Sequence, residues 1–387
     1  MSKPLAEESR PRETSVALLS IEHVLFLCLS GVCESSKFRI DGQLDNAGRN
    51  MKIDCLDTTK NVLIIAEIGN NHEGNFELAK RLIELAAKAG ADIVKFQTIR
   101  ADKFVSVKNQ LRFETLKKFE LSDEQHYQLS RTATDCGVVF LSTPFDLEGV
   151  DMLNTLVPAF KIASGDNTFF PLIERVGRTG KPIILSTGLT TLPEIERTKR
   201  CIEACWRDMK VGSELALLHC VVAYPTPPAQ ANLASIRELA RTFDCVVGYS
   251  DHTLGIDAAV MSVALGARII EKHFTIAKDH SSFRDHQLSA DPTEFKLLVT
   301  RVREAEVLLG SGMKQPQEAE LVNMVAARRS IVAASSLPAG HVLQWQDLLW
   351  MRPSGGISPG DEHLVLGKTL SRSIEKGDPI LVDAVAA

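Results

Sequence analysis

The sequence predicts an α/β fold in which a closed (β/α)8 barrel is followed by a small β-rich domain. Eight short apolar runs alternate with amphipathic helical stretches over about 250 residues, the usual length of such a barrel. The runs are apolar almost without interruption, which is typical of parallel strands buried on both faces. A composition of 44% hydrophobic and 24% charged residues in 387 is that of an ordinary globular protein.

The predicted elements alternate regularly along the chain. We expect strands at 62–68, 92–98, 138–143, 159–163, 182–186, 215–220, 245–250 and 268–274. We expect helices at 76–89, 123–135, 170–178, 192–205, 234–242, 256–265 and 292–309. Glycines follow several of these helices, at positions where a left-handed residue commonly ends a helix.

The chain changes character after the last predicted helix. A polar stretch that follows it is interpreted as a linker. Beyond this stretch, turns that contain Pro and Gly alternate with short β-like pieces at 329–334, 348–351, 369–373 and 379–382. The predicted organisation therefore has four parts. These are an N-terminal extension at 1–58, expected to be poorly ordered, the barrel domain at 59–309, the linker at 310–325 and the β-rich domain at 326–387.

An apolar stretch at 15–33 resembles a membrane anchor or signal peptide at first sight. Glu22 and His23 lie in its middle, and three glutamates precede it. A membrane span needs roughly 20 residues almost free of charge, and a signal peptide needs a clean basic start. We therefore expect no membrane role.

Charge and cysteine content exclude two further classes. The chain has 44 basic and 49 acidic side chains, a net charge of −5, whereas a nucleic-acid-binding protein normally has a basic face. Its eight cysteines form no CxxC pair and no compact framework of the kind found in small secreted proteins. We expect reduced thiols and a cytoplasmic location, with no nucleic-acid partner.

Polar residues gather where the predicted strands end. In a (β/α)8 barrel the carboxyl ends of the strands form the catalytic face. Alternate residues of a strand point the same way, so Lys95 and Gln97 share a face, as do Ser250 and His252, and Glu271 and His273. A single polar strand end is commonly a solvated loop residue, but eight such ends together predict one functional cavity.

Two lysines and a set of hydroxyls form the first chemical group in this cavity. Lys95 and Lys161 are accompanied by Thr143, Ser164, Ser186 and Ser250. Ammonium groups with several hydroxyl donors suit a small dianion such as a phosphate ester. A lysine that forms a Schiff base with a carbonyl substrate is the competing interpretation.

His252 and His273, 21 residues apart on neighbouring predicted strands, form the second group. Two imidazoles with water and substrate oxygens make an open site for a divalent metal ion. We take Mn²⁺ as the first choice, with Mg²⁺ or Co²⁺ as alternatives. A structural zinc would need four N or S ligands, and a lone pair of histidines is otherwise often part of a core or loop.

The acids Glu67, Asp166 and Asp285 form the third group. Carboxylates that face a pocket suit metal binding or hydrogen bonding to sugar hydroxyls. Asp285 lies in the polar stretch SSFRDHQ, where a solvated loop acid is an equally good interpretation.

Motifs at the eight strand ends resemble those of the sialic acid synthase family. They are IIAEIGNNHEGN (64–75), DIVKFQT (92–98), FLSTPFD (140–146), FKIASGD (160–166), KPIILSTG (181–188), LLHCVVAYPTP (217–227), GYSDHTLG (248–255) and EKHFT (271–275). The C-terminal segment resembles that family's antifreeze-like (SAF) domain. The resemblance covers about 61–387 and implies a TIM barrel followed by a SAF domain.

The resemblance also implies a reaction and roles for individual residues. The family condenses phosphoenolpyruvate with an open-chain 2-acetamido sugar such as N-acetylmannosamine, with a metal polarising the aldehyde and phosphate leaving by C–O cleavage. Phosphoenolpyruvate would be held by Lys95, Thr143, Lys161, Ser164, Ser186 and Ser250. The metal would be held by His252 and His273, and the sugar by Glu67, Asp166, Tyr224 and Asp285. We also expect Gln97, which shares a strand face with Lys95, to be a substrate-binding residue. We expect Glu67, Asp166, His252 and His273 to be the catalytic residues, with Glu67 or Asp166 relaying protons.

Arg352, in MRPSGG, matches an arginine of the SAF domain that reaches the sugar's acetamido group in the partner subunit. The resemblance therefore implies a domain-swapped homodimer. Two departures concern the choice of sugar. Val222 stands where better-known members carry Asn, and Asp166 stands where many carry Glu.

Three alternative functions remain open at this stage. The same chemistry could act on a different sugar, as in legionaminic- or pseudaminic-type acid synthases. A lysine aldolase could use Lys161 covalently on the same barrel. A binding protein without catalysis, suggested by the antifreeze-like tail, would leave the strand-end residues without a task.

Overall fold

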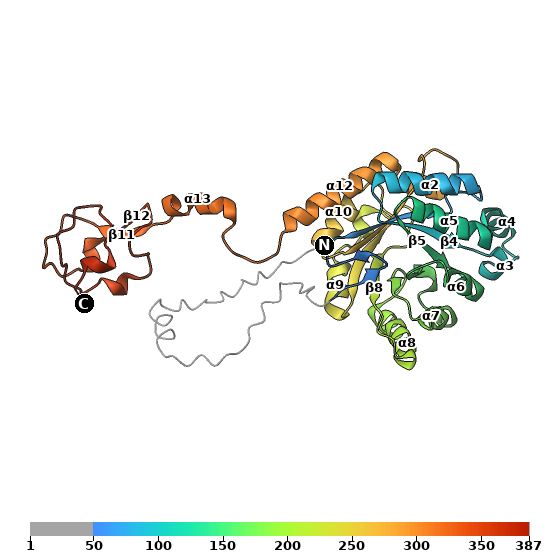
Figure 1. Ribbon diagram of the computed structural model, residues 1–387, viewed down its shortest axis with the longest axis horizontal. Coiled ribbons are helices and arrows are strands. Elements are labelled where there is room, and N and C mark those ends of the chain that lie inside the picture. The colour runs from blue at the N-terminus through green and yellow to red at the C-terminus, as the bar shows by residue number, and fades with distance from the viewer. Residues whose placement is uncertain (1–48, 387) are drawn as a thin grey trace, which may run out of the picture. The chain divides into compact units, whose positions relative to one another are not determined.

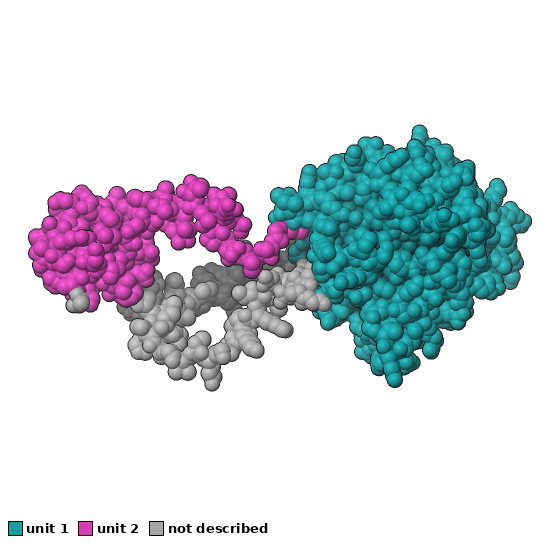
Figure 2. Space-filling model, viewed as in Figure 1, with its two compact units in different colours: residues 1–308 teal, residues 309–387 magenta. Residues whose placement is uncertain are grey.

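The computed structural model describes residues 49–386 (Figure 1). The chain divides into two compact units between Leu308 and Leu309 (Figure 2). The apolar stretch at 15–33 and most of the predicted extension lie outside the described residues. From 49 to 386, no helix combines the length and apolar character needed to cross a bilayer.

Eight parallel strands form the centre of the first unit, and the prediction of a (β/α)8 barrel is confirmed (Figure 1). The strands are β3 (Leu63–Gly69), β4 (Ile93–Thr98), β5 (Val139–Pro144), β6 (Phe160–Ile162), β7 (Ile183–Ser186), β8 (Leu215–Cys220), β9 (Val246–Asp251) and β10 (Ile269–His273). The first strand, β3, is hydrogen-bonded to the last, β10. Since β5 and β6 lie side by side, the sheet curls into a barrel.

A helix follows every strand and covers the outside of the barrel. These helices are α2 (Phe76–Ala89), α5 (Asp123–Asp135), α6 (Leu147–Leu153), α7 (Phe170–Gly177), α8 (Leu192–Met209), α9 (Ser235–Thr242), α10 (Asp257–Ala264) and α12 (Pro292–Leu309). In α2 the buried positions Ala79, Leu82, Ile83 and Ala86 have the 3–4 spacing of one helix face. Its ends are set by the Asn75 side chain and by Gly90, whose φ of 95° is left-handed.

Further short helices lengthen two of the loops at the carboxyl ends of the strands. The helices α3 (Ala101–Phe104) and α4 (Gln110–Phe119) follow β4, and α11 (Arg284–Leu288) follows β10. None of the three was predicted from sequence. α3 and α11 have only four and five residues, and α4 buries only Phe119, so none of the three shows the regular apolar period of a helix that covers the barrel.

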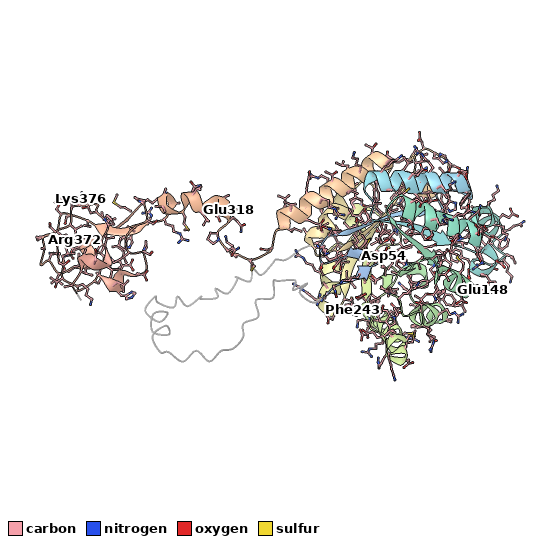
Figure 3. The ribbon with its side chains drawn as sticks, in the orientation of Figure 1. Asp54, Glu148, Phe243, Glu318, Arg372 and Lys376 are labelled. Atoms are coloured by element: carbon pink, nitrogen blue, oxygen red, sulfur yellow. The ribbon has the colours of Figure 1, made fainter. Side chains whose placement is uncertain are left out.

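A small hairpin, β1 (Lys52–Ile53) and β2 (Leu56–Asp57), precedes the barrel. Met51 and Ile53 are fully buried in the barrel core. Arg268, just before β10, donates a hydrogen bond to the carbonyl of Thr58 at 2.7 Å, which places the hairpin at the amino-terminal end of the strands. The sequence interpretation placed 49–58 in the extension, whereas the structure makes this segment part of the barrel. Figure 3 labels Asp54 in its turn.

The second unit contains α13 (Glu318–Ala327), which begins inside the predicted linker at Glu318, labelled in Figure 3. The strands β11 (Ser330–Ala333) and β12 (Leu348–Met351) form an antiparallel pair. The predicted pieces at 369–373 and 379–382 make single bridges and no strands. The unit has its own core, built from residues such as Ile331, Leu348, Val365 and Ile380.

Candidate functional site

The carboxyl ends of the strands enclose a cavity of about 690 Å³. Twelve of the fourteen predicted site residues line it: Glu67, Lys95, Gln97, Thr143, Lys161, Ser164, Ser186, Tyr224, Ser250, His252, His273 and Asp285. Asp166 and Arg352 do not. The strand-end rule therefore located one common cavity for residues spread over more than two hundred positions.

Four buried charges form the floor of this cavity. Lys95 Nζ lies 2.6 Å from Glu67 Oε2 and 3.6 Å from Glu271 Oε2. Lys161 Nζ lies 3.9 Å from Glu271 Oε1. Glu271 thus lies between the two ammonium groups. The four charged residues come from four different strands, β3, β4, β6 and β10. We call Glu67, Lys95, Lys161 and Glu271 the charge cluster.

The surroundings of the charge cluster shift its pKa values in different directions. Burial raises the pKa of Glu67, although Lys95 opposes this. Burial would also raise the pKa of Glu271, but the two lysines hold it below its usual range. Burial lowers the pKa of Lys161, whereas for Lys95 the carboxylates of Glu271 and Glu67 outweigh burial and raise it. Glu67 is therefore the acid of the cluster that most readily holds a proton.

Hydroxyl groups complete the floor. Lys95 donates to Thr143 Oγ1 at 3.1 Å, and Lys161 donates to Ser186 Oγ at 2.7 Å. Because these hydroxyls accept from ammonium groups, their own protons stay available for an anion in the cavity. Ser250 instead donates to Glu271 Oε1 at 2.9 Å.

A pair of side-chain amides orients Glu67. Gln97 Nε2 donates to Glu67 Oε1 at 2.9 Å, and Asn70 Nδ2 donates to Gln97 Oε1 at 2.9 Å. The close fit requires Gly69, since a Cβ there would lie 3.1 Å from Gln97 Nε2 and from Glu67 Oε1. Sequence reasoning missed Asn70, which follows the irregular register at the end of β3.

The two predicted metal ligands are neighbours, with ring centroids 5.4 Å apart. His252 Nδ1 lies 2.9 Å from the carbonyl of Val221, so this nitrogen carries the proton and Nε2 is left for a ligand. His273 Nδ1 is buried without a partner, and burial lowers the pKa of this imidazole, which keeps it neutral. Within the described chain no three ligand-type side chains converge. The pair thus fits an open metal site that takes its other ligands from water or substrate.

Aromatic and charged side chains stand above the histidines. The ring of Tyr224 lies 4.2 Å from that of His252, and the Arg284 guanidinium lies 4.6 Å from the Tyr224 ring centroid. Arg284 Nε is 3.1 Å from Asp285 Oδ1. Asp285 comes from α11, so this wall of the cavity is carried by a loop and not by a strand.

The outer wall of the cavity is largely apolar. Its side chains come from α3, α4 and the loops after β5 and β10, and they are Phe104, Leu111, Leu116, Phe119, Phe145 and Phe283. Its polar members at α4 are Asn109, Arg112 and Thr115, and the Arg112 guanidinium lies 5.5 Å from the Phe104 ring centroid. The wall was not predicted, because α4 does not follow directly from a strand end.

Two predicted residues lie elsewhere. Asp166 follows β6 in a short 3-10 turn, and burial raises its pKa to about 6. Its Oδ2 is buried without a hydrogen-bond partner. Arg352 follows β12 in the second unit and is exposed. Thus the first unit supplies every residue of the cavity.

Comparisons with known proteins agree with this arrangement. The sequence pattern of the NeuB family matches residues 82–314, and that of the SAF domain matches residues 328–386. These two matches correspond to the barrel and to the second unit.

Named relatives align with most of the chain. It is 39% identical to the N,N'-diacetyllegionaminic acid synthase of Campylobacter jejuni, covering 83% of this chain and 99% of the relative. It is 33% identical to the human N-acetylneuraminate-9-phosphate synthase, covering 83% and 92% respectively. Among solved structures, the sialic acid synthetase of Leptospira borgpetersenii has a TM-score of 0.67 at 33% identity, covering 71% of this chain and 95% of that one.

Asp166→Asn should stabilise the protein in a pH-dependent way. A carboxyl with a folded pKa of about 6 and an unfolded value of 3.8 destabilises the folded state once it ionises. The penalty is absent below the unfolded pKa, grows between about pH 4 and 6, and is constant above. Denaturant unfolding at pH 4 and pH 8 should therefore show a gain for the variant only at pH 8. The exposed Asp279→Asn is the control, and an equal gain at both pH values would contradict the burial of Asp166.

Proposed function

Because this chain belongs to the NeuB family and carries a SAF domain, we propose that it condenses phosphoenolpyruvate with an open-chain 2-acetamido sugar. Water is the third reactant, and the products are a sialic-acid-type nonulosonic acid and phosphate. The proposal depends on one observation, that the charge cluster and the paired histidines share a single cavity. The names of the relatives, which are synthases of acids of this type, support it.

We assign phosphoenolpyruvate to the floor of the cavity. Lys95 and Lys161 supply positive charge for its phosphate and carboxylate. Thr143 and Ser186 have hydroxyl protons to donate, because each already accepts from a lysine. Ser164 and Ser250 line the same region. Held there, the substrate would present C3 toward the mouth of the cavity, where the second reactant enters.

We assign the sugar to the upper part of the cavity, beneath Tyr224, Asp285 and the apolar outer wall. C3 of phosphoenolpyruvate attacks the aldehyde carbon, which leaves positive character at C2. Water adds at C2, and phosphate leaves with the bridging oxygen. Glu67 lines the cavity with a raised pKa, and Asp166 does not line it, so we assign the proton relay to Glu67.

His252 and His273 would hold a divalent ion, with Mn²⁺ as the first choice and Mg²⁺ or Co²⁺ as alternatives. Such an ion would supply a Lewis acid for the aldehyde oxygen of the sugar. The chain's own part is to hold both imidazoles at the cavity, each with a ring nitrogen left for the ion. The carbonyl of Val221 accepts from His252 Nδ1, which leaves Nε2 of that ring for the ion, and burial lowers the pKa of His273, which favours its neutral form.

The outer wall bears on the choice of sugar. The apolar side chains of α3 and α4 suit acetamido methyl groups better than a phosphate. We therefore propose a sugar whose far end is uncharged, such as a diacetamido sugar of the legionaminic or pseudaminic type, ahead of a phosphorylated N-acetylmannosamine. The chain's identity to the N,N'-diacetyllegionaminic acid synthase, 39%, is higher than its identity to the N-acetylneuraminate-9-phosphate synthase, 33%, which favours the same choice. If a phosphorylated sugar is preferred, Arg112 is the cation that faces it.

A lysine aldolase remains the second candidate. Burial lowers the pKa of Lys161, which is the change that makes a lysine nucleophilic. Lys161 is however hydrogen-bonded to Ser186 and lies near Glu271, as an anion-binding ammonium does. We therefore rank the condensation first.

Mixing the protein with phosphoenolpyruvate and a sugar should release phosphate. The sugars to compare are N-acetylmannosamine, its 6-phosphate and a 2,4-diacetamido sugar, of which we expect the last to react fastest. With phosphoenolpyruvate labelled by ¹⁸O at the bridging position, mass spectrometry should find the label in the phosphate, because the C–O bond breaks. Label lost from phosphate, or pyruvate trapped on Lys161 by borohydride, would contradict the proposal.

Glu67→Gln should lower kcat by about 100-fold or more, since it removes the proton relay, and the exposed Glu77→Gln should leave it unchanged.

Chelation should abolish turnover, and added Mn²⁺ should restore it. The reason is that the histidine pair provides only part of a coordination shell and holds the ion exchangeably. His252→Ala and His273→Ala should each prevent the recovery, whereas the exposed His363→Ala in the second unit should not. Turnover that survives thorough chelation would refute the metal assignment.

We further propose that Arg352 acts on the sugar's acetamido group in a domain-swapped homodimer. Light scattering should then give twice the chain mass, and mixed subunits should complement each other. A Lys161→Ala subunit retains Arg352, and an Arg352→Ala subunit retains its cavity. If the arginine crosses between chains, co-expression of the two inactive variants restores one complete site per mixed dimer. No recovery in a proven mixed dimer would show that Arg352 acts within its own chain.

A further inference from the structure

His286, the third residue of α11, is fully buried and lies outside the cavity lining. Its Nε2 is 3.0 Å from Glu73 Oε1, and its Nδ1 is 2.6 Å from Thr275 Oγ1. Glu73 belongs to the loop after β3, and Thr275 to the loop after β10. The imidazole therefore joins the first and last βα loops of the barrel. We call Glu73, Thr275 and His286 the loop clasp.

A second set of hydrogen bonds runs beside the loop clasp. Asn71, also fully buried, donates to the carbonyl of Phe274 at 2.8 Å and to Ser289 Oγ at 3.0 Å. Ser289 in turn donates to the carbonyl of Asp285. Both sets connect the segment after β3 to α11, and both end next to residues that face the cavity.

The loop clasp is needed to hold α11 in position, because this helix is only five residues long. A helix of this length has no stability of its own and keeps its position only through tertiary contacts. Phe283, Arg284 and Asp285 line the cavity from its first turn and from the residue before it. Their placement therefore depends on what holds α11 from outside.

The backbone of Glu73 is strained at the position where this residue bonds to His286. Its φ of 49° is left-handed, a region that non-glycine residues occupy rarely and with strain. Burial would raise the pKa of its carboxyl, but hydrogen bonds from Ser281 and His286 lower it. Neighbouring Gly74 has no room for a side chain, since a Cβ there would meet the Lys118 carbonyl at 2.0 Å. The loop is thus fixed between α4 and α11.

We propose that Glu73 and His286 are positioning residues for the sugar, acting through α11 on Asp285 and Arg284. This inference rests on the proposed function, in which Asp285 belongs to the sugar subsite. Phosphoenolpyruvate is assigned to side chains on or directly after strands, which the loop clasp does not touch. Loss of the clasp should therefore weaken the sugar's interaction and leave that of phosphoenolpyruvate intact.

The test compares Glu73→Ala, His286→Ala and the double variant with the wild-type protein. Each single variant should raise the KM for the sugar about 10-fold or more, with the KM for phosphoenolpyruvate within twofold of the wild-type value. The double variant should be no worse than either single one, because the two residues act as one unit. Glu73→Gln keeps the accepting oxygen and should recover most of the loss. The exposed Glu77→Ala is the matched control and should change neither KM.

Hydrogen exchange provides a readout that does not need turnover. Amides of 283–289 should exchange faster in Glu73→Ala and in His286→Ala than in the wild type, with the barrel strands unchanged. If exchange there is unaltered, the proposal is wrong whatever reaction the protein catalyses. Faster exchange with an unchanged sugar KM, or both KM values rising together with a general loss of stability, would also overturn it. Failure of the wild type to use any sugar would instead refute the proposed function.

Discussion

Two ammonium groups and two carboxylates are buried together at the floor of this barrel, and each is stable there only because the others are present. A buried ion costs several kcal/mol unless it is paired and hydrogen-bonded. Glu271 supplies an ion-pair partner to both lysines at once, at 3.6 Å from Lys95 and 3.9 Å from Lys161, and hydroxyl groups accept the lysines' hydrogen bonds. Because Ser250 also donates to it, its charge is fixed in place. The lysines are thereby held beneath the mouth of the cavity and cannot extend into solvent.

The same balance of charge determines how the floor can receive an anion. With all four groups ionised the charge cluster is neutral, which is a poor partner for a phosphate ester. Burial raises the pKa of Glu67, so the acid that most readily takes up a proton is the one beside Lys95. Protonation there would give the cluster a net positive charge while Glu271 keeps both lysines in place. Under the proposed function, a proton taken up by Glu67 would offset the negative charge that the bound phosphate ester brings.

The spacing of apolar residues and the positions of the predicted strand ends were enough to locate the cavity from sequence. The reason is that side chains at the carboxyl ends of parallel strands in a barrel face one opening. Glu271 was visible as a strand-end acid, but its place between two lysines needed the barrel's curvature. The outer wall of α4 and the burial of Ile53 escaped prediction for a different reason. The strand that contains Ile53 has only two residues, and α4 buries only Phe119, so in both segments tertiary contacts alone decide which side chains are buried. Asp166 is the last residue of the 3-10 turn after β6, whose first two residues line the cavity while Asp166 itself does not.

Closure of the barrel places residues from opposite ends of the sequence at one seam. In the pairing of β3 with β10, Glu67 lies opposite His273, so the proposed proton relay and a proposed metal ligand meet across it. The loop clasp and the Asn71 hydrogen bonds cross the same seam just beyond the carboxyl ends of β3 and β10, between the loops that follow these two strands. No local interaction could bring these residues together, since they are separated by about two hundred positions. The site is therefore assembled by barrel closure itself, and the contacts that hold the seam shut also determine where the substrate-facing side chains point.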